Sequence, residues 1–131
     1  MDKKRILVVD DEAELVKALQ IRLKQENYEV LVAYDGKEGL RKAQKYKPDL
    51  IILDILIPKM EGDSVAAALK EDKGTRDIPI IFLTCLAEGL AEKPEGCSLE
   101  LAVEERFRGG NFFLGKPFDT KELMSMVESL L

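Results

Sequence analysis

The segment ILVVDDE, residues 6–12, places four apolar residues directly before three carboxylates. Three of the apolar residues are β-branched, and no polar residue alternates with them. Such a run is typical of a short strand that other elements cover on both faces, as in a parallel sheet. The segment therefore predicts a buried strand whose carboxyl end carries the adjacent charges of Asp10 and Asp11.

Runs of the same kind recur along the chain, and the expected strands cover residues 5–9, 30–34, 50–54, 78–84 and 111–115. Amphipathic patterns with helical spacing separate them. The apolar residues that indicate these helices are Val16, Leu19 and Leu23, then Leu40 and Ala43, then Val65, Ala68 and Leu69, then Leu99, Ala102, Val103 and Phe107, and finally Leu123, Val127, Leu130 and Leu131. Capping pairs are expected for two helices, at Asp35 with Glu38 and at Asp119 with Glu122.

Five β–α pairs in 131 residues predict an α/β fold, an open doubly wound parallel sheet with helices on both faces. The length favours one domain over residues 1–131. In sheets of this kind, ligands bind beyond the carboxyl ends of the strands, where the strand order reverses. That edge is therefore where a functional site is expected.

Composition excludes several classes of function. Charged residues make up 34% of the chain and the net charge is −5, which argues against direct nucleic-acid binding. No apolar run approaches the ~18 residues of a membrane span, and the N-terminus lacks the apolar core of a signal peptide. Cys85 and Cys97 fit a reduced, cytoplasmic protein better than a disulfide scaffold. The absence of histidine excludes histidine catalysis and histidine metal ligation within this chain.

Four of the expected strands end in residues that can carry chemistry: Asp10 and Asp11, Asp54, Thr84, and Lys116. In a sheet of strand order 2-1-3-4-5 these strands are neighbours, and the five side chains would line one crevice. Adjacent carboxylates repel, and a divalent cation such as Mg²⁺, which prefers oxygen ligands, removes that conflict. A metal beside a lysine and a hydroxyl suits a phosphoryl group, for which one aspartate could be the nucleophile.

Each of these residues also has a simpler interpretation. Asp10 or Asp11 could cap a helix, Thr84 could serve in a turn, and Lys116 could be a solvated loop lysine. The conjunction of all of them at four strand ends, in order, favours the functional interpretation.

Four motifs resemble the receiver domains of two-component response regulators: VVDDE (8–12), IILDILIPKMEG (51–62), DIPIIFLT (77–84) and FFLGKPF (112–118). The resemblance covers essentially the whole chain. It implies a flavodoxin-like fold of the chemotaxis-receiver kind, with strand order 2-1-3-4-5. It also implies a signalling domain that promotes only its own phosphoryl transfer and autodephosphorylation, and is otherwise not an enzyme.

The resemblance implies that Asp54 accepts a phosphoryl group from the phosphohistidine of a sensor histidine kinase or phosphotransfer protein. It implies that Asp11 binds Mg²⁺ directly, or Mn²⁺ as a substitute, and that Asp10 acts mainly through a bound water. A carboxylate oxygen of Asp54 and the backbone carbonyl of Leu56 would complete the protein ligands.

The family's switch residues match three positions of this sequence. The resemblance implies that Lys116 contacts the phosphoryl group and that Thr84 rotates inward to bind a phosphoryl oxygen. It also implies that Phe113 turns inward together with the threonine. The alternative for Phe113 is a structural aromatic in the core. An output domain, a partner protein or a second copy of the chain would receive the signal.

The chain departs from the family in ways that affect the lifetime of the phosphoryl group and the output surface. Leu56 and Leu86 stand at positions that tune water access, and both are apolar, which predicts slow autodephosphorylation. Cys85 replaces a smaller residue beside the phosphorylation pocket, and Ile57 replaces the usual methionine. Between Thr84 and the glycine before the last strand the sequence predicts an insertion of about ten residues, mainly within 86–97, which surface loops tolerate.

Other functions fit the sequence less well. GNFFLGKP (110–117) matches the start of a P-loop, but Pro117 replaces the Ser or Thr that would hold Mg²⁺. No Gly-rich dinucleotide motif follows the first strand. An aspartate-dependent phosphotransferase would need a substrate-binding cap for which the chain has no room. The remaining alternative is a receiver-like interaction module that phosphorylation does not regulate.

Overall fold

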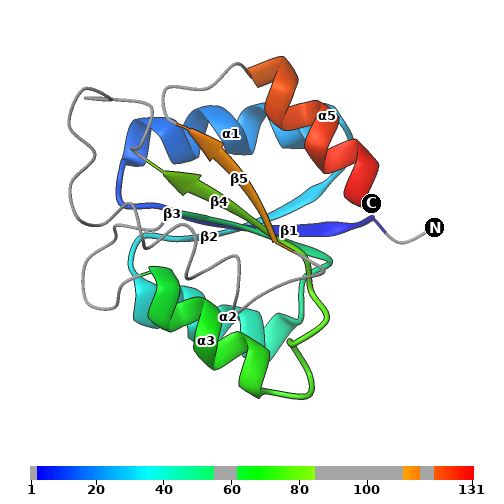
Figure 1. The fold of residues 1–131 in the computed structure, drawn as a ribbon. Coiled ribbons are helices and arrows are strands. Elements are labelled where there is room, and N and C mark those ends of the chain that lie inside the picture. The colour runs from blue at the N-terminus through cyan, green and yellow to red at the C-terminus, as the bar shows by residue number, and fades with distance from the viewer. Residues whose placement is uncertain (1–2, 55–61, 85–110, 116–119) are drawn as a thin grey trace.

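The computed structural model describes residues 3–54, 62–84, 111–115 and 120–131, with the backbone alone at residues 62–63, 84 and 111–115. Along the chain the elements are β1 (Arg5–Val9), α1 (Ala13–Gln25), β2 (Glu29–Ala33), α2 (Gly36–Tyr46), β3 (Leu50–Asp54), α3 (Gly62–Glu71), β4 (Ile80–Thr84), β5 (Asn111–Gly115) and α5 (Thr120–Leu130) (Figure 1). The helix expected around residues 99–107, the insertion and the cap at Asp119 all lie outside the described residues.

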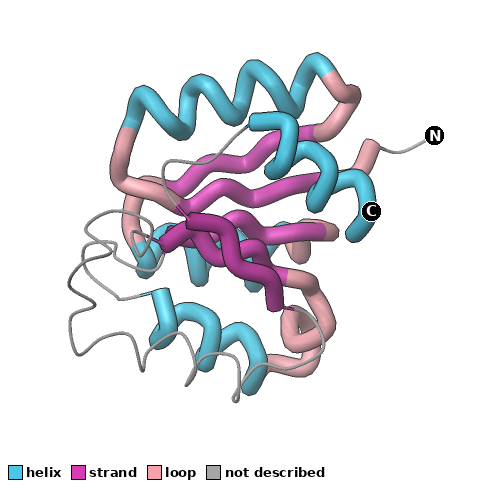
Figure 2. The backbone as a smooth tube through the Cα atoms, turned by 45° about the horizontal axis from the view of Figure 1, so that its top comes forward, coloured by secondary structure: helices cyan, strands magenta, loops and turns pink. Residues whose placement is uncertain are grey.

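The five strands form one parallel sheet in the order β2-β1-β3-β4-β5. This confirms the predicted fold class and strand order. Figure 2 shows the strands lying side by side between the two layers of helices. The order reverses at β1, so β1 and β3 are adjacent and deliver their carboxyl ends to the same edge.

Two strands differ from their predicted bounds, and hydrogen bonding explains both shifts. β2 begins one residue early, because the N–H of Glu29 donates to the carbonyl of Lys4 at 2.9 Å. It also ends early, because the N–H of Tyr34 donates to Oε1 of Glu38 at 2.9 Å instead of continuing the ladder. β4 begins at Ile80 because the N–H of Ile78 closes a turn onto Thr75 and Pro79 has no N–H to contribute.

The predicted start of α2 is confirmed. Oδ1 of Asp35 accepts the N–H of Glu38 at 2.8 Å, as a helix cap should. The reciprocal bond of the capping box reaches the N–H of Tyr34, one residue before the cap. In α3 the buried residues include Ala66 beside Val65 and Leu69, while Ala68, which the pattern favoured, is only partly buried.

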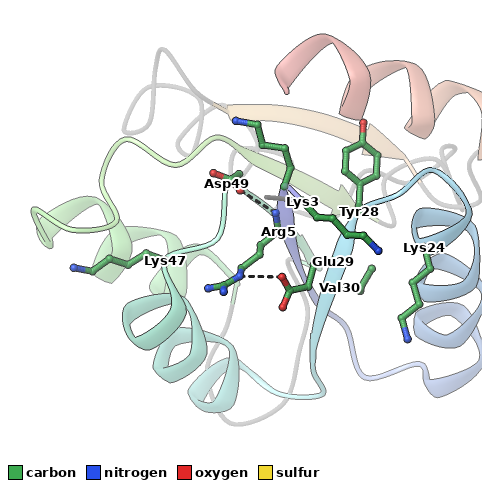
Figure 3. A pocket seen from close by; sticks show the side chains of 9 residues that line it. Lys3, Arg5, Lys24, Tyr28, Glu29, Val30, Lys47 and Asp49 are labelled. Carbon is green, nitrogen blue, oxygen red and sulfur yellow. Dashed lines mark hydrogen bonds and ion pairs between the residues drawn. The ribbon is translucent and has the colours of Figure 1, made fainter. Parts of the chain in front are cut away.

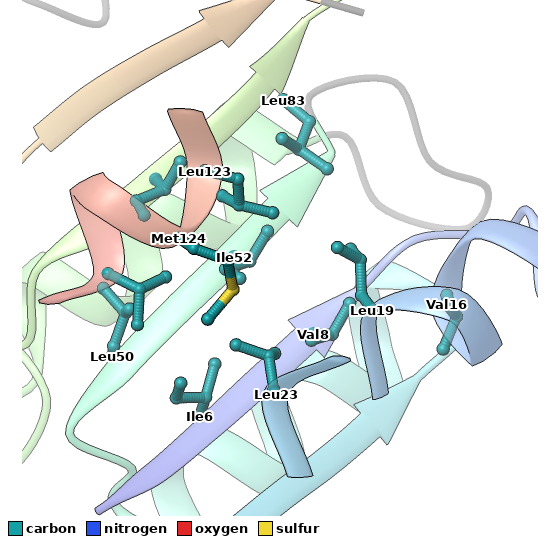
Figure 4. Close-up of a cluster of buried hydrophobic side chains, with 12 residues drawn as sticks. Ile6, Val8, Val16, Leu19, Leu23, Leu50, Ile52, Leu83, Leu123 and Met124 are labelled. Atoms are coloured by element: carbon teal, nitrogen blue, oxygen red, sulfur yellow. The ribbon is translucent and has the colours of Figure 1, made fainter. Parts of the chain in front are cut away.

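Alternation along the central strands divides the core into two clusters. One faces α1 and α5 and is shown in Figure 4, where Ile6 and Val8 of β1 meet Leu19 and Leu23 of α1. The other faces α2 and α3, and its β1 members are Leu7 and Val9. Each cluster packs against one face of β1 and β3. The two strands, and therefore their ends, are held by helices on both faces of the sheet. Within the described ranges no helix is long and apolar enough to cross a membrane.

Candidate functional site

Asp10, Asp11 and Asp54 meet at the carboxyl edge of the sheet. Val9 at the end of β1 pairs with Leu53 of β3, which brings the residues that follow, Asp10 and Asp54, to adjacent positions. One carboxylate oxygen from each of the three aspartates lies within 4.8 Å of the others. The structure therefore brings together the three carboxylates that the sequence singled out as one cluster.

The surroundings of the three carboxylates differ. Asp10 is fully buried and Asp54 is 4% exposed, whereas Asp11 is exposed. Oδ1 of Asp10 accepts the N–H of Glu12 at 2.9 Å, and the backbone N–H of Asp10 donates to the carbonyl of Ala33 at 3.1 Å. These bonds fix the position of Asp10 relative to both β2 and the start of α1.

Helix capping and membership of the site were alternative predictions for Asp10, and in the structure its carboxylate does both. Glu12 is the residue that caps α1, and its own side chain makes no capping hydrogen bond. The Asp10 carboxylate instead supports the turn into α1 through the N–H of Glu12, two residues on. Sequence reasoning missed this bond, although an aspartate that ends an apolar run two residues before the capping position of a helix is the signal for it. Glu12 does not belong to the cluster.

The electrostatics of the cluster favour a cation. Two unit charges 4.8 Å apart repel by ~3.5 kcal/mol at an effective dielectric constant near 20. Two of the three aspartates are buried, so water screens this repulsion poorly. A divalent cation with a preference for carboxylate oxygens fits this donor set, because it converts the repulsion into coordination. The three aspartates can therefore hold a divalent metal ion.

The backbone of β4 and β5 brings two further predicted residues to the sheet. Leu83 of β4 pairs with Asp54, so Thr84, the last residue of β4, lies one step along at the same edge. Thr84 in turn pairs with Gly115 of β5, and Phe113 pairs with Phe82 in the middle of the strands. Lys116, Leu56, Ile57, Cys85 and Leu86 lie outside the described residues, so their predicted roles stay predictions.

Comparison with known proteins identifies the class. A sequence profile of the response regulator receiver domain matches residues 6–128. The chain therefore belongs to the response regulator receiver domain family, which consists of signalling domains rather than ordinary enzymes and whose members interact with histidine kinases.

One relative is the alkaline phosphatase synthesis transcriptional regulatory protein PhoP of Bacillus subtilis, 38% identical over 98% of this chain and 48% of its own. This chain thus spans about half the length of that relative. Among solved structures, the chemotaxis protein CheY4 of Vibrio cholerae superposes with a TM-score of 0.80 and 31% identity, over 99% of this chain and 100% of the other.

A third match is the receiver domain of the sensor histidine kinase PA1611 from Pseudomonas aeruginosa, solved with a magnesium ion coordinated in its active-site cleft. It superposes with a TM-score of 0.79 and 25% identity, over 98% of each chain. These likenesses agree with the parallel sheet and acidic cluster described above.

Proposed function

We propose that this domain is a phosphoacceptor switch in which Asp54 accepts a phosphoryl group from the phosphohistidine of a partner kinase. The observation that carries the proposal is the convergence of Asp10, Asp11 and Asp54 at the carboxyl edge of a receiver-family sheet. The proposed phosphoacceptor domain covers residues 1–131.

The chemistry assigned to Asp54 is nucleophilic. One of its carboxylate oxygens attacks phosphorus, the bond between phosphorus and the kinase imidazole breaks, and the electron pair leaves with the imidazole nitrogen. Asp54 suits this role because β3 is buried along its whole length and fixes the carboxylate at the strand end. Asp10, held by the N–H of Glu12, and the exposed Asp11 flank it.

Mg²⁺ is the proposed metal, with Mn²⁺ as a substitute. It would be held by Asp11 and Asp54 directly, by the backbone carbonyl of Leu56, and by Asp10 through water. Bound there, it would neutralise negative charge on the phosphoryl oxygens. The magnesium ion in the PA1611 receiver domain supports this choice.

The proposed switch uses Thr84, Lys116 and Phe113. Phosphorylation adds about −1.5 to −2 charges, which a hydroxyl and an ammonium group near Asp54 would bind. The position of Thr84, beside the partner of Asp54 in β4, supports its part in this response. Apolar residues at 56 and 86, with Cys85, would restrict water and prolong the phosphorylated state.

The partners follow from the family and remain part of the proposal. The donor would be a sensor histidine kinase or a phosphotransfer protein in the cytoplasm. PhoP is named as a transcriptional regulator, and this chain matches about half of it, which supports an output that controls transcription. We expect these 131 residues, with a net charge of −5, to act on that output rather than on DNA directly.

The proposal is tested by incubating the purified protein with Mg²⁺ and acetyl phosphate. Intact mass should increase by one phosphoryl group, and the adduct should resist acid and hydrolyse in base, as an acyl phosphate does. Asp54→Asn should abolish the adduct, whereas Asp77→Asn, at an exposed site elsewhere, should form it normally. An adduct that persists in Asp54→Asn would refute the assignment, and no adduct in the wild type would favour an interaction module that phosphorylation does not regulate.

A further inference from the structure

A second feature lies at the opposite edge of the sheet. A recess of about 950 Å³ opens at the amino ends of β1, β2 and β3. Its lining residues come from the strand starts and from the ends of α1 and α2: Lys3, Lys4, Arg5, Lys24, Tyr28, Glu29, Val30, Lys47 and Asp49. We call this the basic recess. It is separated from the aspartate cluster by the length of a five-residue strand, ~16 Å.

The basic recess is strongly positive in a chain that is negative overall. Five cations and two carboxylates line it, whereas the whole chain carries a net charge of −5. Arg5 engages both carboxylates: its backbone N–H donates to Asp49 at 2.8 Å, and its Nε lies 3.2 Å from Oε2 of Glu29. Figure 3 shows this ion pair between Lys47 on one side and Lys24 on the other.

Among the described residues, the four lysines of the basic recess take no part in a salt bridge. Salt bridges within the described ranges involve Arg5, Arg22 and Lys42. Backbone hydrogen bonds anchor two of these lysines, Lys4 and Lys47. Lys4 accepts the N–H of Glu29, and Lys47 caps α2 with its N–H donating to Ala43. Lys4 and Lys47 are therefore held in place through their backbones, and Arg5 engages both carboxylates of the lining, Glu29 and Asp49.

Tyr28 adds a neutral hydrogen-bond donor to this lining. Burial, together with the nearby Glu128 and Glu26 carboxylates, raises the pKa of its phenol above the ordinary 10.0. The phenol is therefore protonated at neutral pH and can donate to an anionic oxygen.

We propose that the basic recess binds an oligophosphate anion, either inorganic or carried by a nucleotide. Its volume of about 950 Å³ is large enough to admit a compact ligand. Lysines act on phosphate as mobile point charges, and several of them around one concavity match a chain of phosphates better than a single carboxylate. This site is independent of phosphorylation at Asp54.

A purely structural role for the same lysines makes a different prediction. Lys24 and Lys47 stand at the C-terminal ends of α1 and α2, where the helix dipole favours a cation. If that were their only role, replacing them would lower stability without any ligand to lose. The test must therefore measure binding and stability separately.

The test is titration of the full chain with tripolyphosphate by calorimetry, in metal-depleted buffer of low ionic strength. Amide NMR shifts should change at Glu29, Val30 and Lys47 and not at Asp11. The double variant Lys24→Gln/Lys47→Gln should lose about tenfold in affinity, as expected for two exposed charge contacts. The control Lys17→Gln/Lys37→Gln removes the same charge from exposed positions on α1 and α2 outside the recess and should bind normally.

Comparing tripolyphosphate with a nucleoside triphosphate shows which part of the ligand the basic recess binds. Equal affinity for tripolyphosphate and a nucleoside triphosphate identifies the phosphate chain as the ligand, and tighter binding of the nucleotide adds a base contact. Binding should weaken steeply in about 0.5 M NaCl, because salt screens exposed charges. No heat or shift change at millimolar tripolyphosphate, equal losses in both double variants, or binding of a polyglutamate peptide in place of tripolyphosphate would each overturn the proposal.

Discussion

Replacing Asp10 by Asn should stabilise the metal-free protein, although Asp10 belongs to the proposed site. The variant removes one charge from a cluster whose carboxylate oxygens lie within 4.8 Å of each other. The repulsion between Asp10 and the buried Asp54 costs about 3.5 kcal/mol at 4.8 Å and an effective dielectric constant near 20. Asn keeps the oxygen that accepts the N–H of Glu12, although a neutral acceptor weakens that bond by about 1 kcal/mol.

The expected net gain in the free energy of unfolding is therefore about 1–3 kcal/mol. Urea unfolding followed by circular dichroism measures it, and with a slope near 2 kcal/mol per molar urea the midpoint should rise by about 0.5–1.5 M. Glu71→Gln is the matched control, because it also removes one negative charge but lies exposed at the end of α3, away from the cluster. Its midpoint should change little.

Addition of Mg²⁺ should reduce the difference in stability between the variant and the wild type. A ligand at 100 times its dissociation constant stabilises the folded state by about 2.7 kcal/mol, and the wild type should show a gain of this kind. Asp10→Asn, with one carboxylate fewer, should gain less. If the variant is no more stable than the wild type without metal, after correction by the Glu71→Gln control, then repulsion does not dominate the cluster and the reasoning fails.

Three further predictions concern other parts of the molecule. Gly39→Ala should destabilise the fold by about 1–3 kcal/mol in urea unfolding, because its Cβ would lie 2.9 Å from both γ-carbons of the buried Val9; an unchanged midpoint would show that α2 moves away freely. Thr75→Val should cost about 1–2 kcal/mol, since the buried Thr75 hydroxyl donates to the carbonyl of Leu69 at 2.7 Å, and Thr75→Ser should restore most of the loss if that bond is responsible. Phosphorylated protein in Mg²⁺ should lose its phosphoryl group slowly, because residues 56 and 86 are apolar; a half-life of seconds, measured by mass spectrometry, would contradict this.

Local sequence patterns were sufficient for most of the secondary structure. The apolar runs at 5–9, 50–54 and 111–115 became strands with the predicted bounds. A strand that is covered on both faces needs such a run whatever its neighbours are, so its signal is local. The start of α2 could also be predicted from the sequence, because the capping hydrogen bond joins Asp35 and Glu38, which are only three residues apart.

The sequence pattern gave the wrong strand bounds where a backbone N–H had two competing hydrogen-bond acceptors. The residues at 78–79 are as apolar as the strand that follows, but the turn after α3 takes the N–H of Ile78. Likewise the side chain of Glu38 takes the N–H of Tyr34 and ends β2. Such competition depends on the position of a helix end in the folded protein. The spacing of apolar residues along the sequence does not specify that position.

By itself, the sequence determined which residues end the strands and therefore which side chains could carry chemistry. Only the tertiary structure decided that Asp10 is buried and bonded to the turn into α1 while Asp11 is exposed. The same holds for the basic recess, whose lysines come from a strand start and from the ends of two helices. Distances between such groups arise from the parallel pairing of β1 with β2 and β3, because that pairing gathers strand ends that are far apart in the chain.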